Sequence, residues 1–268
     1  MSGEAPFAAG DACLLYDEKG RRYLIELIPG RDFHYHHGVL AHDDIVGSRN
    51  GATFRSSRGA ELVAMRPRLA DYVLKMGRGP TVVYPKDAGP ILIWADIGPG
   101  MTVVEAGTGS GGLTMVLARA VLPGGAVISV ERRADHSAGA RRRIEGFFRS
   151  GLELGHVSFL VGSVEEVIAE STPDRVVLDV PEPWHSVGPA AERLPGGGVF
   201  CCYLPTVPQV QAVRDAIAAT GCFIEVDTFE VLHREWAVDG RSVRPEHRMV
   251  GHTGFITVGR KRLRSGES

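Results

Sequence analysis

The chain has 268 residues, a length that suits one large domain or one α/β domain with a small companion. Hydrophobic residues make up 44% of it and charged residues 23%, as in globular proteins, and no apolar run is long enough to suggest a membrane-spanning helix. The formal net charge of -2 lacks the basic excess that nucleic-acid-binding proteins often have, so it leaves a small-molecule enzyme open.

The four cysteines favour a cytoplasmic protein with buried thiols. Cys201 and Cys202 are adjacent inside an apolar run, and neither these two nor Cys13 and Cys222 have Cys-x-x-Cys spacing. Residues 1–6 contain no basic patch followed by an apolar core, so we expect no secretory signal.

Residues 1–66 are expected to form a small β domain, because short runs of β-type residues alternate with turn signals such as Asn50-Gly51. The expected strands are Ala12–Tyr16, Arg22–Ile28, Ala52–Phe54 and Glu61–Met65. Residues 67–97 are expected to be a connecting helical segment. Its helices are predicted at Pro67–Met76, ended by Gly77-Arg78-Gly79-Pro80, and at Lys86–Ala95.

From residue 98 to residue 268 strands and helices alternate, which predicts an α/β, Rossmann-like domain with a mostly parallel, doubly wound sheet. The expected strands are Thr102–Ala106, Ala126–Glu131, Val157–Val161, Arg175–Val180, Gly198–Leu204, Phe223–Val231 and Thr253–Val258. The expected helices are Gly112–Val121, Ala134–Arg149 and Val207–Thr220. Only a long polar stretch, Leu232–Gly251, separates the last two strands, so they are expected to pair antiparallel.

A glycine-rich turn after the first strand of this domain is the strongest local signal. It reads Glu105-Ala106-Gly107-Thr108-Gly109-Ser110-Gly111-Gly112-Leu113. Glycines let the backbone pass close to a ligand, and an open α/β sheet binds ligands beyond the carboxyl ends of its strands. We therefore expect this loop to hold a nucleoside-bearing cofactor, the alternative being a glycine turn without a ligand.

The spacing of Gly107, Gly109 and Gly112 also fits the dinucleotide fingerprint, so the loop alone does not separate NAD from S-adenosylmethionine. Two features favour S-adenosylmethionine. The carboxylate of Glu105 can meet a cationic cofactor through its amino-acid end but would repel a pyrophosphate. The loop also lies far into the chain, after residues 1–104.

Glu131 ends the next expected strand, where an acidic side chain can accept hydrogen bonds from both ribose hydroxyls of a cofactor. This role suits NAD and S-adenosylmethionine equally. The alternative is an ion pair between Glu131 and the neighbouring Arg132 or Arg133.

Asp179 follows an apolar run that predicts a central strand, and it begins the stretch Asp179-Val180-Pro181-Glu182-Pro183-Trp184. Because prolines cannot continue a ladder, the chain must leave the sheet here in a stiff loop. A carboxylate, rigid prolines and an aromatic ring suit a flat base with an exocyclic amine, as in amino-group methyltransferases of nucleic acids. The alternative is that Asp179 caps a helix or forms a turn.

Two motifs are specific together: Tyr84-Pro85-Lys86-Asp87 and, further along, Leu178-Asp179-Val180-Pro181-Glu182-Pro183-Trp184. With them occur Phe33–Gly38, Met76–Pro80, the loop Glu105–Gly111, Arg244–Met249 and Gly251–Thr253. In these motifs the chain resembles the TrmI-type tRNA (adenine N1)-methyltransferases, particularly actinobacterial members, over nearly its whole length.

The resemblance implies a class I methyltransferase domain with a small N-terminal β domain, S-adenosyl-L-methionine as cofactor and tRNA as partner. It implies methylation of N1 of the T-loop adenosine at position 58 by a homotetramer. From the residues themselves we expect a cytoplasmic enzyme that needs no metal and no membrane. Asp179 matches the family's catalytic aspartate, and Tyr84 matches a tyrosine that helps to hold the target base. The expected cofactor-binding residues are Glu105, Gly107, Thr108, Gly109, Ser110, Gly111, Leu113, Glu131, Ser163 and Asp179.

The chain departs from the family after its third strand, where the family usually has an acidic residue that touches the adenine amine of the cofactor. Ser163 takes that place in this sequence, and its hydroxyl can still accept a hydrogen bond. Alternatively, Glu165 reaches the cofactor.

Several other polar and aromatic residues have two interpretations. Histidines at 34, 36 and 37 face RNA or are structural rather than zinc ligands, because no Cys or carboxylate is suitably spaced. Trp184 and Trp236 either stack on a base or fill the core or an interface. Basic residues near the domain junction form either a phosphate-binding strip or ordinary surface charge: Arg55, Arg58, Arg66, Arg68, Lys75 and Arg78.

The alternative functions are a diverged methyltransferase acting on a small molecule or other acceptor, and a non-catalytic subunit that binds RNA or a partner. Retention of the glycine loop and Asp179 argues against the non-catalytic subunit. An NAD-dependent oxidoreductase is a more distant alternative.

Overall fold

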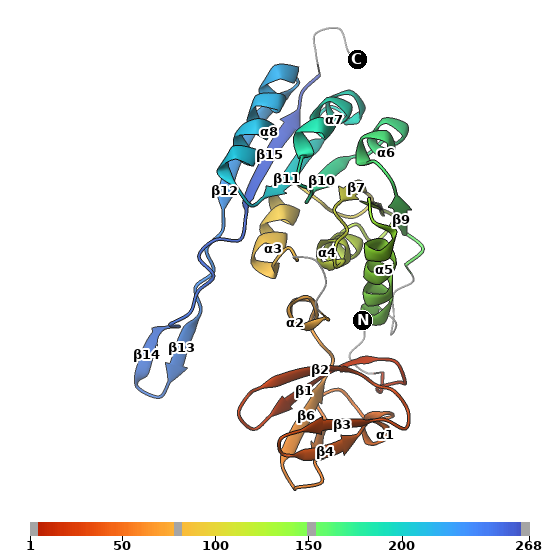
Figure 1. Cartoon of the computed structure of the whole chain (residues 1–268), viewed down its shortest axis with the longest axis vertical. Helices are drawn as coiled ribbons and strands as arrows, with labels where there is room; N and C mark the ends of the chain where they lie inside the picture. Colours follow the sequence, from red (N-terminus) through yellow and green to blue (C-terminus); the bar gives the residue numbers. More distant parts are fainter. Residues whose placement is uncertain (1–4, 78–81, 149–153, 264–268) are drawn as a thin grey trace. The chain divides into compact units, whose positions relative to one another are not determined.

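The computed structural model describes residues 5–77, 82–148 and 154–263, and it divides the chain into two compact units (Figure 1). Unit 1 consists of residues 1–78 and 141–154, and unit 2 of residues 79–140 and 155–268. The connecting segment predicted at 67–97 is shared between them, because helix α2 (Leu69–Lys75) belongs to unit 1 and helix α3 (Pro85–Trp94) to unit 2. Arg78, Gly79 and Pro80 of the Met76–Pro80 motif, and residues 264–268, lie outside the described residues.

Unit 1 contains an N-terminal β sheet, together with helix α2 and residues 141–148 of the helix Ala134–Phe148. Four strands form an antiparallel sheet in the order β2 (Arg22–Glu26), β1 (Ala12–Asp17), β6 (Glu61–Met65), β5 (Thr53–Arg55). A hairpin that the sequence did not predict, β3 (Asp32–Tyr35) and β4 (Gly38–Ala41), leads into the short helix α1 (His42–Ile45). The core contains Phe7, Cys13, Leu15, Leu27, Leu40, Ile45, Leu62 and Ala64.

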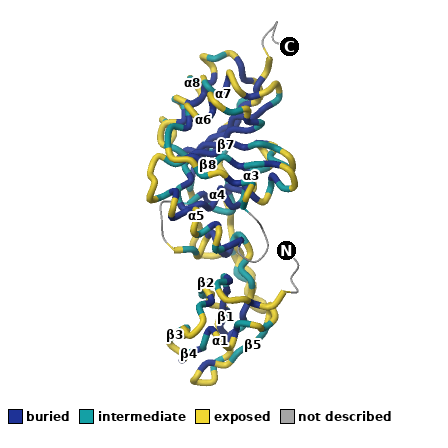
Figure 2. The backbone as a smooth tube through the Cα atoms, turned by 90° about the vertical axis from the view of Figure 1, so that its right-hand side faces the viewer, coloured by how far each residue is buried: buried dark blue, intermediate teal, exposed yellow. Residues whose placement is uncertain are grey.

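Unit 2 contains the doubly wound sheet that the alternating pattern predicts. Its strand order is β12 (Phe223–Glu230), β15 (Phe255–Lys261), β11 (Val199–Leu204), β10 (Arg175–Leu178), β7 (Thr102–Ala106), β8 (Ala126–Glu131), β9 (Val157–Val161). The strands from β11 to β9 are parallel, and β15 runs antiparallel to both β11 and β12. Strands β7 and β8 are mostly buried (Figure 2), which explains their nearly continuous apolar sequence.

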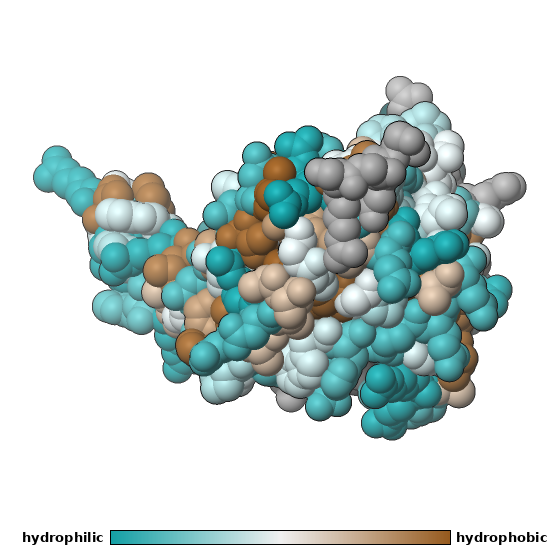
Figure 3. Space-filling model, turned by 90° about the horizontal axis from the view of Figure 1, so that it is seen from above, coloured by the Kyte–Doolittle hydropathy of each residue, from teal (hydrophilic) through white to brown (hydrophobic). Residues whose placement is uncertain are grey.

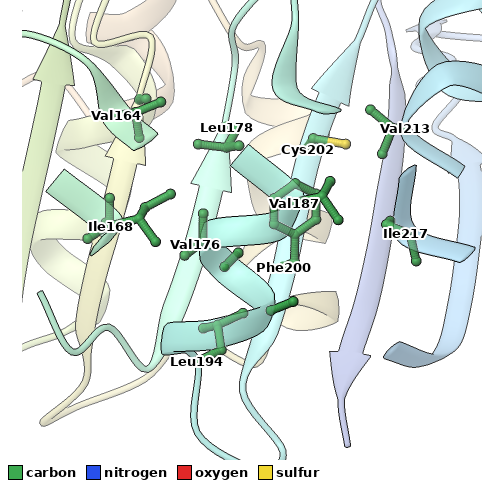
Figure 4. Close-up of a cluster of buried hydrophobic side chains, with 14 of the residues drawn as sticks. Val164, Ile168, Val176, Leu178, Val187, Leu194, Phe200, Cys202, Val213 and Ile217 are labelled. Carbon is green, nitrogen blue, oxygen red and sulfur yellow. The ribbon is translucent and has the colours of Figure 1, made fainter. Parts of the chain in front are cut away.

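Helices cover both faces of this sheet, so the carboxyl ends of its parallel strands are left free to form a site. On one face lie α6 (Val164–Glu170), α7 (Val187–Arg193) and α8 (Val207–Thr220), whose side chains meet those of β10 and β11 (Figure 4). The other face carries α3 and α4 (Gly112–Ala120), and α5 (Ala134–Phe148) follows β8. The sequence did not predict α6, α7 or the turn of 3-10 helix η1 at Pro183–Ser186.

The polar stretch Leu232–Gly251 lies between the antiparallel strands β12 and β15, and the sequence did not predict the structure within it. It contains a two-stranded hairpin, β13 (Trp236–Asp239) and β14 (Ser242–Pro245), that projects away from the sheet of unit 2 (Figure 1). Its exposed apolar side chains include Trp236, Val238 and Val243, and hydrophobic patches are visible at its position on the left of Figure 3.

Two further findings concern the cysteines and the helices. Each of the four cysteines is buried and free. Within residues 5–77, 82–148 and 154–263, none of the helices has the length and apolar character needed to cross a bilayer.

Candidate functional site

The glycine loop joins β7 to α4 and takes a backbone conformation that requires glycine. Gly107 has φ +88°, and a Cβ placed on it would lie 1.9 Å from the carbonyl oxygen of Asp179. Gly111, at the N-cap of α4, has φ +87°. The tips of β7 and β10 therefore approach each other more closely than any side chain at position 107 would allow.

A buried hydrogen-bond network fixes this loop from below, and Glu105 is its centre. The Glu105 carboxylate accepts hydrogen bonds from Thr114 Oγ1 at 2.8 and 3.0 Å and from Ser129 Oγ at 2.6 Å. Ser129 is in turn 2.7 Å from Thr108 Oγ1. Burial, with a smaller contribution from the charge of Glu131, raises the pKa of Glu105 to about 7. Glu105 is fully buried and does not line the cavity described next.

A cavity of about 660 Å³ opens at the carboxyl ends of the parallel strands, a volume within the range of cofactor and small-molecule sites. Of the predicted site residues, Gly107, Gly109, Glu131 and Asp179 line it. Glu131 accepts hydrogen bonds from the backbone amides of Gly109 and Arg133, each at 3.1 Å. The Arg133 guanidinium pairs with Asp135 instead, so Glu131 remains directed to the loop and the cavity.

The other predicted residues do not line the cavity: Thr108, Ser110, Gly111, Leu113, Ser163 and Tyr84. Ser110 Oγ is buried and has no hydrogen-bond partner among the described residues. Tyr84 is the N-cap residue of α3, and its backbone carbonyl accepts hydrogen bonds from the amides of Asp87 and Ala88.

Asp179 lines the cavity directly after β10, and its side chain forms no hydrogen bond or ion pair with the described part of the chain. Its backbone amide donates to the carbonyl of Ala106 at 2.8 Å, which anchors the residue to the end of β7. The N-cap of the following 3-10 helix is Glu182, so Asp179 is not a helix cap. Burial, reinforced by the charge of Glu105, raises the pKa of Asp179 to about 7.

The third strand tip presents Glu165 rather than Ser163 to the cavity. Ser163 Oγ donates to the Glu165 carboxylate at 2.5 Å, Ser186 Oγ donates to it at 3.0 Å, and Arg132 lies 3.9 Å away. Burial acts to raise the pKa of Glu165, but these hydrogen bonds and the charge of Arg132 outweigh it and lower the pKa. Glu165 is therefore an ionised acceptor at the cavity wall.

A polar group that the sequence did not indicate lies beside the cavity. Tyr203 and Thr253 line it, and both donate hydrogen bonds to the fully buried Asp87, which pairs with Lys86. Lys86 and Asp87 belong to one of the two specific motifs, but nothing in one sequence indicated that Thr253, far along the chain, would meet them. Arg132, His136 and Gln209 also line the cavity.

His36 and three of the basic residues considered for a phosphate-binding strip have local partners. His36 lies beside Arg21, and no cluster of potential metal ligands occurs among the residues that the structure describes. Arg55, Arg66 and Arg68 pair with Glu61, Asp11 and Asp71 respectively, which favours ordinary surface charge over a phosphate-binding strip. Arg78 lies outside the described residues.

The two tryptophans that were considered for base stacking, Trp184 and Trp236, lie in different environments. Trp184 packs against the core that includes side chains of α7 and α8, while Trp236 is exposed on the hairpin. Of the two interpretations, core filling therefore applies to Trp184.

Two family models match the chain. The model described as tRNA methyltransferase complex GCD14 subunit matches residues 60–249, and the model described as TrmI-like N-terminal matches residues 5–54. Among curated proteins, a tRNA (adenine(58)-N(1))-methyltransferase TrmI of Thermus thermophilus is 40% identical over 92% of this chain and 96% of its own length. The tRNA (adenine(57)-N(1)/adenine(58)-N(1))-methyltransferase TrmI of Methanocaldococcus jannaschii is 35% identical over 92% and 94%.

Solved structures give the same result. The tRNA (m1A58) methyltransferase TrmI of Aquifex aeolicus superimposes with a TM-score of 0.82 at 26% identity, covering 97% of this chain and 100% of that one. A Thermotoga maritima protein, titled a SAM-dependent O-methyltransferase, gives a TM-score of 0.90 at 31% identity over 97% and 96%. Sequence, fold and the arrangement of the glycine loop thus agree, and the chain belongs to the family of TrmI-type tRNA (adenine-N1)-methyltransferases.

Proposed function

We propose that this protein transfers a methyl group from S-adenosyl-L-methionine to N1 of adenine 58 in the T-loop of tRNA. Membership of the family supports the reaction type and the tRNA substrate. The observation that carries the proposal for this chain is the Asp179 carboxylate, which lines the cavity beside the glycine loop with no protein partner among the described residues.

The residues around the loop fit the cofactor. The backbone at Gly107 leaves no room for a Cβ, which suits close approach of a ligand. Ser110 Oγ is buried without a hydrogen-bond partner among the described residues. Glu131 lines the cavity, where its carboxylate can accept hydrogen bonds from ribose hydroxyls. When bound, the cofactor supplies an electrophilic methyl group on a positively charged sulfur. Glu105, Thr108, Gly109, Gly111 and Leu113 would act with these residues by shaping the loop.

The adenine end of the cofactor needs an acceptor for its amino group. We place Glu165 in that role and Ser163 behind it, because Ser163 donates its hydroxyl to Glu165 and only Glu165 lines the cavity. This arrangement would compensate for the missing acidic residue at position 163.

Asp179 is proposed as the catalytic residue. Adenine N1 has an available lone pair, and its methylation places positive charge on the ring. A carboxylate that accepts a hydrogen bond from the 6-amino group stabilises that charge more in the transition state than before it. Tyr84 is proposed to help to hold the base, which contributes through positioning.

The second candidate is methylation of a small acceptor on the same scaffold. The near-neutral net charge favours it, as does the similarity to the Thermotoga maritima protein described as a SAM-dependent O-methyltransferase. Methyl transfer to a small acceptor but not to tRNA would establish it.

The direct test incubates the enzyme with an unmodified tRNA transcript and labelled S-adenosylmethionine, followed by nucleoside analysis. We expect 1-methyladenosine in the transcript and none in a matched transcript with guanosine at position 58. Label in another nucleoside, or equal label in both transcripts, would refute the proposed target.

Substitution of Asp179 tests the catalytic role. Asp179→Ala is expected to lower kcat by about a hundredfold to a thousandfold, because the developing charge on adenine loses its partner. The Kd for the cofactor, measured by calorimetry, should change by less than about threefold. Asp179→Asn keeps the shape and removes the charge, so a comparable fall in kcat would identify the charge as the cause. Equal losses in kcat and cofactor affinity would contradict the proposal.

The proposed assembly rests on the resemblance, and the proposed location rests on the cysteines. We propose a homotetramer, supported by the exposed apolar side chains of the β13–β14 hairpin. We propose the cytoplasm as its compartment, because four buried, unpaired thiols suit a reducing environment.

A further inference from the structure

A buried acidic side chain that the proposed mechanism does not use lies beside the cavity of unit 2. Asp87, on α3, is fully buried. Its carboxylate is 2.7 Å from Lys86 Nζ and accepts hydrogen bonds from Thr253 Oγ1 at 2.7 Å and from the Tyr203 hydroxyl at 3.1 Å. Since Tyr203 and Thr253 line the cavity, hydrogen bonds connect this group to the site.

Lys86 extends the same group to the segment that carries the projecting hairpin. Its Nζ donates to the Val231 carbonyl and to Thr253 Oγ1, each at 2.6 Å. Val231 follows β12 and Thr253 precedes β15, so one ammonium group holds both ends of the segment between these strands. All three donors of Lys86 thus have acceptors, and its charge is balanced by Asp87.

The ring of Tyr203 is fixed on two sides. A Cβ at Gly254 would lie 2.5 Å from Tyr203 Cζ, so the glycine backbone is in close contact with the ring. At its hydroxyl end the ring is held by Asp87. Burial, together with the charges of Asp87 and Asp179, raises the pKa of Tyr203, so the hydroxyl remains a donor at neutral pH.

A buried ion pair is by itself weak evidence of a stabilising role, because its replacement by apolar side chains is often neutral or stabilising. On the basis of the proposed function, we propose that Asp87, paired with Lys86, is a positioning residue for Tyr203. The Tyr203 ring forms one wall of the target-base site, in the same cavity as Asp179. The rigid ring would orient the flat base so that its 6-amino group meets the Asp179 carboxylate.

The test compares Tyr203→Phe, Asp87→Asn and the double variant in the tRNA methylation assay at saturating cofactor. Each single variant is expected to lower kcat by about tenfold to a hundredfold with little change in KM for tRNA, since misplacement of the base affects the transition state. The double variant should be no slower than the slower single variant, because both changes remove the same contact. The Kd for S-adenosylhomocysteine should stay within about twofold of the wild-type value.

Tyr72→Phe is the matched control. Tyr72 is also a buried tyrosine, and its hydroxyl donates to the Arg143 carbonyl at 2.9 Å, but it lies in unit 1 and does not line the cavity. We expect Tyr72→Phe to lose as much thermal stability as Tyr203→Phe but to keep the wild-type kcat. Tyr203→Phe removes only a hydroxyl, so it decides the question by itself if Asp87→Asn does not fold.

Two outcomes overturn the inference while the proposed function stands: Tyr203→Phe with wild-type kcat, or single effects that multiply in the double variant. If the wild-type protein forms no 1-methyladenosine, the proposed function fails and this inference fails with it. The positioning role is established by three results together. Both single variants have a lowered kcat, the double variant has a kcat no lower than the slower single variant, and the Tyr72→Phe control keeps wild-type kcat.

Discussion

At the scale of single residues, the site is defined by two carboxyl groups whose pKa values are raised for the same reason. Glu105 and Asp179 are both removed from water, which disfavours the ionised form of each, and the charge of Glu105 further disfavours ionisation of Asp179. They differ in their partners: Glu105 accepts hydrogen bonds from Thr114 and Ser129, whereas Asp179 has none among the described residues. A buried carboxyl group that faces a cavity without a partner is typical of a functional group rather than a stabilising one.

Glu105→Gln tests this electrostatic coupling through the pH dependence of activity. The pKa of Asp179 is raised to about 7, so its ionised, active form accumulates as pH rises, and kcat/KM should increase up to about that pH. Removal of the Glu105 charge eliminates one of the causes of the raised pKa, so this rise should move to lower pH. An unchanged pH profile, measured from about pH 5 to about pH 9 in steps of about half a unit, would contradict the coupling.

The same variant should show a pH-dependent gain in stability. The folded-state pKa of Glu105, about 7, lies above its ordinary value of 4.5, so burial of its charged form destabilises the fold. Protonated Glu105 contributes its whole stabilising effect when the pH is below its ordinary pKa. This contribution is lost as the pH rises through its folded-state pKa. Chemical denaturation should therefore find Glu105→Gln more stable than wild type above neutral pH, with the difference shrinking toward acid pH.

At the scale of elements, the glycine loop after β7 contains a glycine whose lack of a side chain is required by the neighbouring strand β10. Gly107 is required less by its own turn than by the backbone of Asp179, which approaches it from β10. The turn conformation was expected from the sequence, but the identity of the neighbour that excludes a side chain was not.

Gly107→Ala should therefore be damaging beyond the effect of its backbone conformation. We expect a loss of about 2–4 kcal/mol in the free energy of unfolding, from strain plus overlap with Asp179, and weaker binding of S-adenosylhomocysteine. Gly100→Ala is the matched control, because Gly100 has φ +83° and a Cβ added to it would meet nothing within 4 Å. That control should lose only about 1–2 kcal/mol. Equal losses in the two variants, measured by urea denaturation, would contradict the overlap.

Prediction of elements succeeded where the sequence pattern was long and apolar. Strands β7, β8 and β9 and helix α8 were predicted with the bounds that the structure has. Helices α6 and α7 were missed because seven residues span too few turns to give a clear period, and packing on the sheet stabilises them. The hairpin β13–β14 was missed because both its faces are largely exposed, so no buried face marks its alternation.

At the scale of the whole molecule, the hairpin is the feature of unit 2 that the isolated chain leaves unexplained. Val238 and Val243 are paired across its two strands and are 71% and 58% exposed, respectively. Exposed apolar side chains on a projecting element are typical of an interface.

Charged substitutions on the hairpin test the proposed tetramer. Val238→Asp with Val243→Asp is expected to lower the mass measured by light scattering from four chains to a smaller assembly, because buried charges without partners destabilise an interface. Asp239→Ala with Ser242→Ala, a neighbouring pair in the same register, is the control and should remain a tetramer. A wild-type protein that is monomeric, or a tetramer that withstands both aspartates, would refute the hairpin's role.

The sequence by itself determined the fold class, and it predicted that the glycine loop and Asp179 lie together at the strand ends. These features depend on local patterns: an apolar strand, a glycine turn and an acid followed by prolines. Only the tertiary structure decided which polar groups share the cavity. Glu165, not Ser163, lines the cavity, and Glu105 is buried under the loop and does not line it. Asp87 accepts hydrogen bonds from Tyr203 and Thr253, which are more than a hundred residues away along the chain. The physical reason is that such contacts depend on strand order and on the approach of backbones, and neither is encoded in the spacing of neighbouring residues.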